Sequence, residues 1–493
     1  MAFLGTLIKA KRASSSSSTP PILDTYPAPV AYSLEYLSTS FVGNPVVTVR
    51  RSSDNSTSSF TPSQITSTDN TAGNLLNFTP DAFTGSGCKF SNLNRNLFIT
   101  SDNVDLRVTG DLTIIGHMKL DTYTSGAQAI VTKYGTAGNR GYQVRINGSG
   151  RLAFLWSEDG TNQLSVNSAV MPVSGGDEVC FKIDFDVDNG AGGRTITFSL
   201  SSDGGQTFTQ FDQAVETGTT QIFPSTDTLE LMLTSQSAGE VYRLTIKDGI
   251  DGVDVFDADF TSRPALSGEF TENTGKVVTP NFTECFITDW HNQGTLAASA
   301  DVTQLTAGSQ PLIYDSVNGL IRGANGKPAI SFDGIDDNLN CPLFSSNVEN
   351  DWVFAVTQRD SNERGAIFKN GNNNNGWAVG YGGNNFDEFG DNIIALYQAT
   401  RWLPTGYSTN TTLNSLIASH LKNTDLDIYQ NGTEISPVFT GAGVNAPSDI
   451  FYVGGYANRH LKQTMQEFVF FTSDQTANRS AIETDINNRY TIY

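Results

Sequence analysis

The sequence contains few charged residues, and basic residues are scarcer than acidic ones. Charged residues make up 16% of the 493 positions, and 30 Lys and Arg against 51 Asp and Glu give a formal net charge of −21. Helical bundles and coiled coils depend on many Glu and Lys side chains, so the composition argues against them. Nucleic acids and anionic membrane surfaces bind through clustered Lys and Arg. We therefore expect neither nucleic acid nor a membrane as a partner.

Cysteine is also rare, and the apolar stretches are short. The chain has four cysteines, none of them in a C-x-x-C pair: Cys88, Cys180, Cys285 and Cys341. This spacing excludes a disulfide-rich scaffold and a zinc-finger type of site, so we expect four buried thiols. No apolar stretch approaches the roughly 20 residues of a membrane-spanning helix.

Gly, Ser, Thr and Asn are plentiful, and they separate many short segments with the period-two alternation of β-strands. The clearest example is a hairpin within 178–205, where the loop DNGAGG joins two alternating strands. Its inward-facing residues are predicted to be Val179, Phe181, Ile183, Phe185, Ile196, Phe198 and Leu200. The hydrophobic content of 38% suffices for sandwich cores, because only alternate strand residues point inward.

Only one segment, at 473–490, has the pattern of a helix. Ser473 is a suitable N-cap, and Ile482, Ile486 and Tyr490 recur on one helical face. Many short strands and one terminal helix predict an all-β fold of antiparallel jelly-roll sandwiches with a short C-terminal helix.

Four pieces of the first half resemble the laminin-G-like branch of the concanavalin A-like sandwiches. They are NVDLRVTGDLTIIGHMKL, AQAIVTKYG, GYQVRINGSGRLAFLWS and FKIDFDVDNGAGGRTITF, and they occur in the order found in that family. The first piece resembles the strand of type L-x-x-x-G-D-x-T that opens the family's jelly roll. The resemblance covers about 81–283 and implies one complete sandwich.

A second resemblance is split along the chain. AYSLEYLSTSFVGNPVVTVRRSSDNS (31–56) resembles the opening of the arabinofuranosidase sandwich, a pattern also frequent in phage and marine bacterial proteins. The turn that normally follows is matched by DWHNQG (289–294), and GKPAISFDGIDDNLN (326–340) and the end of the chain continue the pattern. We therefore expect a concanavalin A-like sandwich made of 27–80 and 284–493, with 81–283 inserted in one of its loops.

The N-terminus predicts a detached peptide. Apolar residues precede the basic ones, the reverse of a secretory signal, and the Ser/Pro run ASSSSSTPP follows at 13–21. We expect 1–26 to be a flexible anchor and linker that binds other virion proteins. The anchoring side chains are predicted to be Phe3, Leu4, Leu7 and Ile8.

Glycan binding requires aromatic rings beside amides and carboxylates on loops. The Asn-rich segment 370–391 and the segment TRWLPTGY that follows concentrate such residues. The candidate glycan-binding residues are Trp377, Tyr381, Phe386, Trp402 and Tyr407.

Calcium is the one candidate inorganic ligand, and the sequence requires no cofactor. Asp333, Asp336 and Asp337 fall in the tight turn FDGIDDN, where three carboxylates could bind the ion. The alternating acids of IDFDVDNG (183–190) look similar, but no Glu closes that loop, so we expect solvated carboxylates there.

Catalytic motifs are weak throughout. No E-x-D-x-x-E strand of the concanavalin-like glucanases is present, and there is no G-x-S-x-G elbow. The segment SSDGGQTF (201–208) resembles the Asp-box of sialidases, which is a structural turn, so a single copy predicts a hairpin turn around Asp203.

The composition is that of an exported surface protein, but the sequence has no recognisable export signal. This combination favours a non-enzymatic virion protein of a tailed phage. It would be assembled in the host cytoplasm and exposed on the virion surface as a capsid decoration, fibre or tail appendage. Its lectin-like sandwiches would bind host or environmental glycans, and an oligomer is compatible with this role. The alternatives are a glycoside hydrolase of arabinofuranosidase-like type and a purely structural spacer.

Overall fold

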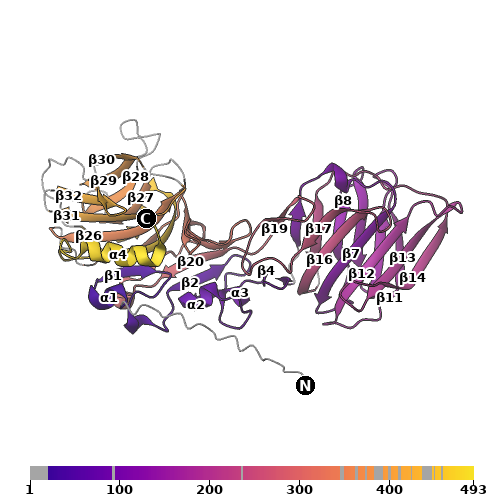
Figure 1. Cartoon of the computed structure of the whole chain (residues 1–493), viewed down its shortest axis with the longest axis horizontal. Coiled ribbons are helices and arrows are strands. Elements are labelled where there is room, and N and C mark those ends of the chain that lie inside the picture. The colour runs from indigo at the N-terminus through magenta and orange to yellow at the C-terminus, as the bar shows by residue number, and fades with distance from the viewer. Residues whose placement is uncertain are drawn as a thin grey trace, which may run out of the picture.

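The computed structural model describes residues 20–91, 95–234, 237–342, 344, 349–360, 365–371, 375–381, 392–397, 401–408, 412–422, 425–435, 447–448, 450–456 and 459–493. Strands dominate these ranges, so the prediction of an all-β fold is confirmed. They form two lobes along the long axis of the molecule (Figure 1). In the described part of the chain, no helix is long and apolar enough to cross a membrane.

One lobe consists of two antiparallel sheets built only from residues 82–280. The first sheet has the order β11 (Leu164–Val170), β10 (Arg151–Trp156), β9 (Arg140–Ile146), β8 (Gln128–Tyr134), β15 (Leu229–Thr234), β6 (Arg95–Thr100), β19 (Val277–Pro280) and β18 (Phe270–Thr271). The second has β14 (Thr209–Thr217), β13 (Gly193–Ser201), β12 (Glu178–Asp186), β7 (Leu112–Leu120), β16 (Gly239–Asp248), β5 (Cys88–Phe90) and β4 (Ala82–Phe83), and β17 (Val253–Asp259) pairs with β16. We call this lobe the inserted sandwich.

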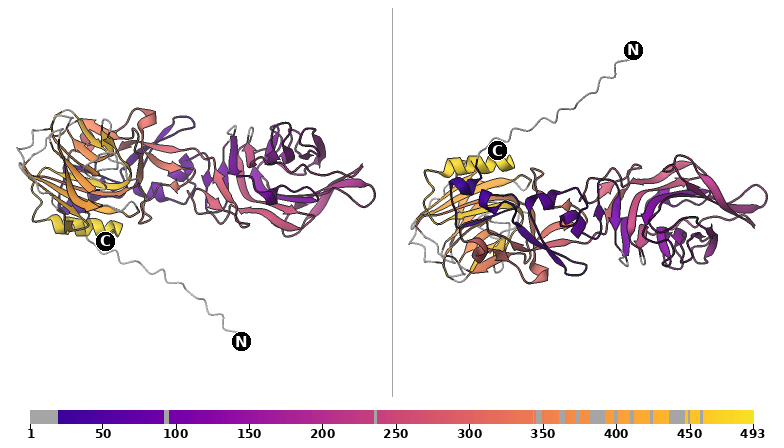
Figure 2. Two further views of the ribbon diagram at one scale, coloured as in Figure 1. Left: turned by 90° about the horizontal axis from the view of Figure 1, so that it is seen from above. Right: turned by 90° about the horizontal axis from the view of Figure 1, so that it is seen from below.

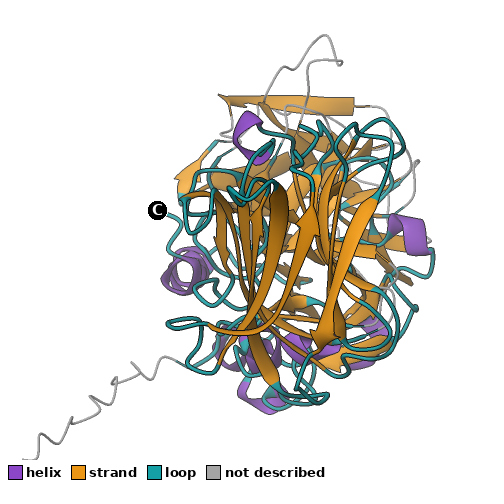
Figure 3. Cartoon of the chain, turned by 90° about the vertical axis from the view of Figure 1, so that its right-hand side faces the viewer, coloured by secondary structure: helices purple, strands orange, loops and turns teal. Residues whose placement is uncertain are grey.

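The two sheets of the inserted sandwich stand face to face when the molecule is viewed from this end (Figure 3). Aromatic rings of facing strands meet between them. Phe185 of β12 lies 4.9 Å from both Phe154 and Trp156 of β10, measured between ring centroids. The predicted hairpin is present as β12 and β13, with Val179, Phe181, Ile183, Phe185, Ile196 and Phe198 buried and Leu200 partly buried against the core.

The other lobe, here called the split sandwich, combines strands from both ends of the chain. Its N-terminal strands are β1 (Val30–Ser33), β2 (Val47–Arg51) and β3 (Thr57–Phe60). Its C-terminal strands are β20 (Cys285–Trp290), β21 (Val302–Thr303), β22 (Leu312–Asp315), β23 (Gly319–Leu320), β24 (Ile330–Asp333), β25 (Leu339–Pro342), β26 (Asp351–Arg359), β27 (Gly365–Asn370), β28 (Trp377–Tyr381), β29 (Asn392–Tyr397), β30 (Arg401–Ser408), β31 (Ser415–Lys422), β32 (Asp425–Gln430), β33 (Thr433–Glu434), β34 (Ile450–Val453) and β37 (Lys462–Phe471). A small separate pair is formed by β35 (Gly455–Tyr456) and β36 (Arg459–His460).

Strand β37 joins the distant parts of the split sandwich. It pairs with β1, β24 and β26, so that Val30 lies opposite Phe470. Nine of its ten residues are buried, as expected for a central strand covered on both faces. The split sandwich is therefore complete only when both ends of the chain are present.

Short helices cover parts of the split sandwich. They are α1 (Ile22–Thr25), α2 (Pro62–Thr66), α3 (Leu75–Phe78) and α4 (Arg479–Tyr490). Ile482, Ile486 and Tyr490 of α4 are buried, which confirms the predicted helix face. The predicted start at Ser473 is wrong, because Asp474 accepts a hydrogen bond from the Thr476 amide in a separate turn and the helix begins after Asn478.

Both ends of the described chain lie on the split sandwich, where α1 and α4 share one apolar cluster. Figure 2 shows α4 along the outside of this lobe. The Tyr490 hydroxyl is 2.9 Å from the Ser33 hydroxyl of β1, which ties the C-terminal helix to the first strand.

The junction between the lobes is crossed twice by the chain and is held by polar contacts. Arg95 Nη2 donates to Asp81 Oδ2 at 2.5 Å and to Thr283 Oγ1 at 3.0 Å, so one side chain joins both crossings. The Leu320 amide donates to the Leu266 carbonyl, and the Glu269 amide donates to the Val317 carbonyl. These contacts bind a loop of the inserted sandwich to a turn of the split one.

The four cysteines are buried and free, as predicted.

Candidate functional site

The structure places two of the predicted glycan-binding aromatics in the core of the split sandwich. Trp377 and Tyr381 lie in β28 and are each 1% exposed. Trp377 packs edge-on against Phe368, with 4.9 Å between ring centroids. A ring with no exposed face cannot stack on a sugar, so this burial contradicts the prediction for these two residues.

The other predicted aromatics and the predicted anchor cannot be placed in the same way. Phe386 lies outside the described residues, as do the anchor residues Phe3, Leu4, Leu7 and Ile8. Trp402 and Tyr407 belong to β30, where Trp402 is opposite Leu396 of β29, and their side chains lie outside the described part of the chain. These assignments stay predictions.

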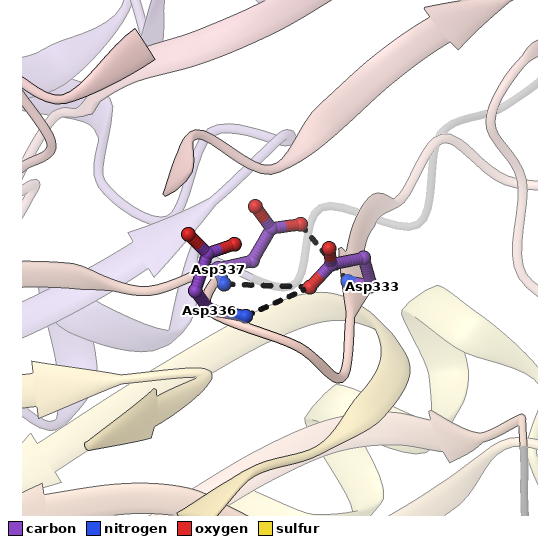
Figure 4. A group of neighbouring side chains, drawn as sticks. All are labelled: Asp333, Asp336 and Asp337. Carbon is purple, nitrogen blue, oxygen red and sulfur yellow. Dashed lines mark hydrogen bonds between the residues drawn. The ribbon is translucent and has the colours of Figure 1, made fainter. Parts of the chain in front are cut away.

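The three acids predicted to bind calcium do come together. Carboxylate oxygens of Asp333, Asp336 and Asp337 lie within 4.8 Å of one another at the end of β24 (Figure 4). The positive φ of Gly334, +81°, allows the tight turn that brings them together. Burial, together with the charges of Asp333 and Asp336, raises the pKa of Asp337 to about 7.

Two of these carboxylates bond within the turn, and the third, Asp336, accepts from Ser309 Oγ at 2.9 Å. Asp333 Oδ1 accepts hydrogen bonds from the amides of Ile335, Asp336 and Asp337, at 2.7, 3.3 and 3.4 Å. Asp337 Oδ2 accepts from the Asp333 amide at 2.9 Å. The donor chemistry fits calcium, but three side chains supply fewer oxygens than its usual six to eight unless they bind bidentately. The turn accounts for the cluster without an ion.

The acids of the first hairpins serve local roles. Asp203 accepts hydrogen bonds from Ser201 Oγ and from the amide and hydroxyl of Thr207, and these bonds hold its pKa well below its usual range. This is the structural turn predicted for SSDGGQTF. Asp184 accepts from Thr113 Oγ1 at 2.7 Å and pairs with Lys182 at 3.0 Å.

The histidines are held by neighbouring side chains and backbone. His291, which the sequence places in DWHNQG, has Nδ1 2.8 Å from Asp301 Oδ2 and Nε2 2.9 Å from Thr48 Oγ1. His117 lies beside Glu178, His420 stacks on the ring of Trp352, and His460 lies beside the Asp337 carbonyl.

The same DWHNQG turn has a function in folding that the sequence alone did not reveal. Asn292 and Gln293 are buried, and their amide oxygens accept hydrogen bonds at 2.7 Å from the backbone amides of Ala31 and Leu37. Gln293 Nε2 donates in return to the Glu35 carbonyl at 2.8 Å. This turn therefore fastens the first strand to the C-terminal part of the split sandwich.

A pocket of about 330 Å³ opens in the inserted sandwich, where β6 ends beside the β18–β19 hairpin. Its lining residues are Ile99, Thr100, Ser101, Asp102, Asn103, Gly275, Lys276, Val277 and Thr279. Sequence reasoning missed it because the two lining segments are far apart in the chain and only the pairing of β6 with β19 brings them together.

Ion pairs fix the charged groups of this pocket. Asp102 Oδ1 accepts from Lys133 Nζ at 2.8 Å, and its Oδ2 binds Arg107. Hydrogen bonding to Arg107, followed by the contact with Lys133, lowers the pKa of Asp102. Lys276 Nζ lies 3.2 Å from Asp105 Oδ2.

No protein-family model matches the sequence, and no curated protein matches it either. Among solved structures, Trypanosoma rangeli sialidase is similar at 12% identity and a TM-score of 0.29, over 72% of this chain and 70% of that one. A second similar structure is domain 4 of AbnA, a GH43 extracellular arabinanase from Geobacillus stearothermophilus, in complex with arabinotriose. It is 18% identical over 35% of this chain and 83% of that one, with a TM-score of 0.27. A SAP-like pentraxin from Limulus polyphemus is 12% identical over 32% of this chain and 80% of that one, with a TM-score of 0.26. Likeness at these values establishes neither a shared family nor a shared site.

Proposed function

We propose that the protein is a non-enzymatic, glycan-binding structural component of a tailed-phage virion, displayed as a capsid decoration, fibre or tail appendage. The composition supports this proposal, because a net charge of −21 is compatible with uncharged partners such as neutral glycans. The protein would be assembled in the host cytoplasm and exposed on the virion surface.

The observation that carries the proposal is the position of the chain ends. The described chain begins and ends on the split sandwich, and the inserted sandwich projects from the opposite side of the junction (Figure 1). An attachment peptide at residues 1–26 would thus lie at one end of an elongated molecule. The inserted sandwich would be held away from the particle, where it can meet a surface glycan.

Attachment is tested with particles. We expect mass spectrometry of purified virions to detect the full-length protein. A variant lacking residues 1–20 should remain soluble and folded, since the first helix begins at Ile22, but it should no longer be incorporated. Normal incorporation of this variant would contradict the anchor, and absence of the full-length protein from particles would contradict the virion assignment.

A second candidate function, glycoside hydrolysis, has one observation in its favour. Asp337, with its pKa raised to about 7, stands beside two further carboxyl groups within 4.8 Å. A carboxyl group that is partly protonated at neutral pH next to another acid suits general acid–base catalysis. The hydrogen bonds that Asp333 accepts from the turn backbone speak for a structural role instead.

Binding and hydrolysis are separated by two assays on the full-length protein. A glycan array should give signals, and a polysaccharide panel should release no reducing sugar. Release that is lost in Asp337→Asn would establish the hydrolase instead. A blank array with no release would identify a structural spacer.

A further inference from the structure

The outer faces of the two sheets of the inserted sandwich differ in how their charges are paired. On the second sheet, cations and acids pair within the face: Lys182 with Asp184 at 3.0 Å, Arg243 with Asp257 at 2.6 Å and Lys247 with Asp254 at 2.5 Å. On the first sheet, two charges of opposite sign have no such partner. Unpaired charges are open to a second molecule, so this face is the candidate for an interaction surface.

The strand register shows which side chains share this outer face, because cross-strand partners point to the same side of a sheet. One row of partners crosses six strands: Ser165 (β11), Leu155 (β10), Gln143 (β9), Thr132 (β8), Glu230 (β15) and Ile99 (β6). Arg145 belongs to the next row, opposite Ala153 of β10. Val144 and Phe154 occupy the alternate positions and are buried in the core. Arg145 and Glu230 therefore lie on the outer face, one strand on either side of β8.

Neither of these two charges is paired within the chain. In the described part of the chain, the Arg145 guanidinium makes no hydrogen bond or ion pair; its Nε is buried, and its two terminal nitrogens are accessible. Glu230 forms no ion pair or side-chain hydrogen bond with the described residues either, and burial, followed by the charge of Asp227, raises its pKa. Both side chains are partly buried. A partly buried, unpaired charge costs free energy that a partner of opposite charge recovers.

The two halves of this face carry opposite charge. Beyond Arg145, the outward positions of β10 include Arg151, whose Nη1 donates to the Ser168 carbonyl at 2.8 Å. On the other side of β8, Glu269 accepts from Thr279 Oγ1 of β19 at 2.6 Å. The acidic half thus lies toward the junction, beside β19, and the basic half lies toward the far end of the molecule (Figure 1).

We propose that the outer face of the first sheet binds the same face of a second copy of this chain, with Arg145 of each copy paired with Glu230 of the other. A two-fold axis along β8 exchanges the two halves of the face, so that basic meets acidic at two equivalent contacts. The inference goes beyond the proposed function and does not depend on it.

The same charges select how the two copies are oriented. With the axis along β8, the copies lie antiparallel, and their split sandwiches are at opposite ends of the dimer. With the axis across the strands, the copies would lie parallel, but Arg145 would face Arg145 and Glu230 would face Glu230. Like charges in contact disfavour that arrangement. The second sheets, on the other side of each inserted sandwich, remain exposed in the antiparallel dimer.

The size of the face is sufficient for a dimer of this kind. The six strands from β11 to β6 have six or seven residues each. With a strand spacing of about 4.8 Å and a rise of about 3.3 Å per residue, they span roughly 600 Å² per copy. Two copies would bury about 1,200 Å², which is at the lower end of specific interfaces. The centre of the face, with Leu155, Gln143 and Thr132, is uncharged, so it adds no repulsion.

The test measures the oligomeric state of the full-length protein by sedimentation equilibrium. The variants are Arg145→Glu, Glu230→Arg and the double variant that carries both reversals. Lys119→Glu is the control, because Lys119 is an exposed cation of β7 in the second sheet. Circular dichroism checks that every variant is folded.

We expect the wild type to form dimers, and each single reversal to weaken dimerisation at least tenfold, because like charges then meet at two symmetric contacts. The double variant should recover the wild-type dimerisation constant to within about threefold, since it restores opposite charges at both contacts. Lys119→Glu should leave the constant unchanged. Recovery in the double variant distinguishes a direct contact from a loss of local structure.

Three results would overturn the inference. A wild-type protein that stays monomeric at about 0.1 mM would show that the face does not bind a second copy. A dimer that is unaffected by the single reversals would place the interface elsewhere on the molecule. A double variant no better than the single ones would show that Arg145 and Glu230 do not meet across the interface.

Discussion

The inserted and the split sandwich are both built from antiparallel strands, but they differ in how far apart in the sequence the paired strands lie. Every strand of the inserted sandwich comes from 82–280, and its partners lie within that segment. In the split sandwich, β37 pairs with β1, more than 430 residues earlier in the chain. The inserted sandwich can therefore form as soon as its own segment is available, whereas the split one must wait for the C-terminus.

The largest effect we predict comes from separating these two parts. A fragment of residues 81–283 should fold alone, because its two sheets and their aromatic core are complete. The full chain without residues 462–493 should retain the inserted sandwich and lose the split one, since β37 and α4 are missing. Limited proteolysis with mass spectrometry reports which lobe is protected. An unfolded 81–283 fragment would show that the junction is needed for its stability.

Core substitutions should affect one lobe at a time. Phe98 of the inserted sandwich lies 4.6 Å from Phe260, and Phe468 of the split sandwich lies 5.3 Å from Phe368, between centroids. Both side chains are fully buried, so Phe98→Ala or Phe468→Ala should each cost about 3–5 kcal/mol. We expect calorimetry to show two unfolding transitions, and each variant should lower the midpoint temperature of only one of them. A shift of both transitions would mean that the lobes unfold together.

A smaller effect is expected at the junction that both lobes share. Asp81 is buried and accepts from Arg95, Thr283 and the Ser91 amide. Asp81→Ala removes these bonds and should cost about 2 kcal/mol, the scale of hydrogen bonds to a charged group. Hydrogen exchange should become faster in 281–285 while the sheet centres keep their protection. Unchanged exchange there would show that the backbone contacts of Leu266–Glu269 suffice to hold the junction.

The smallest predicted effect is a pH dependence confined to the split sandwich. The folded-state pKa of Asp337, about 7, is above the value of 3.8 for an unperturbed Asp, so the folded protein binds this proton more tightly. The contribution of this group to stability is fully present below pH 3.8 and is lost as the pH rises through 7. The side chain of Asp337→Asn cannot ionise. The stability of this variant minus that of the wild type should therefore be larger at pH 8 than at pH 5.

Thermal melts at the two pH values test this prediction, with Asp336→Asn as the control for removing a carboxylate from the exposed part of the same turn. An equal difference between variant and wild type at both pH values would contradict it. Repeating the pH 8 melt with calcium tests the calcium hypothesis, because a bound ion would stabilise the wild type and not Asp337→Asn.

The features that the sequence predicted well are those that depend on neighbouring residues. Period-two alternation identified β12 and β13, and the spacing of Ile482, Ile486 and Tyr490 identified the buried face of α4. The start of α4 was wrong because Ser473, Asp474 and Asn478 are all residue types that favour N-caps, and Ser473 and Asp474 form a turn before the helix instead.

The features that the sequence missed depend on distant pairing. Trp377 and Tyr381 looked like a binding surface because they follow a polar segment, but all five residues of β28 are buried. Alternation cannot distinguish the faces of a strand that is covered on both sides. The pocket beside Thr100 likewise requires the register of β6 against β19, and no local pattern contains that information.

The double crossing at the junction has a mechanical consequence. A force that pulls on the inserted sandwich is shared by two adjacent segments, and Arg95 links them through Asp81 and Thr283. The backbone bonds from Leu266–Glu269 to the turn at Val317–Leu320 brace the same place from the side. A single linker would act as a hinge, whereas this doubled and braced connection should resist bending, so that a force on the inserted sandwich reaches the split one.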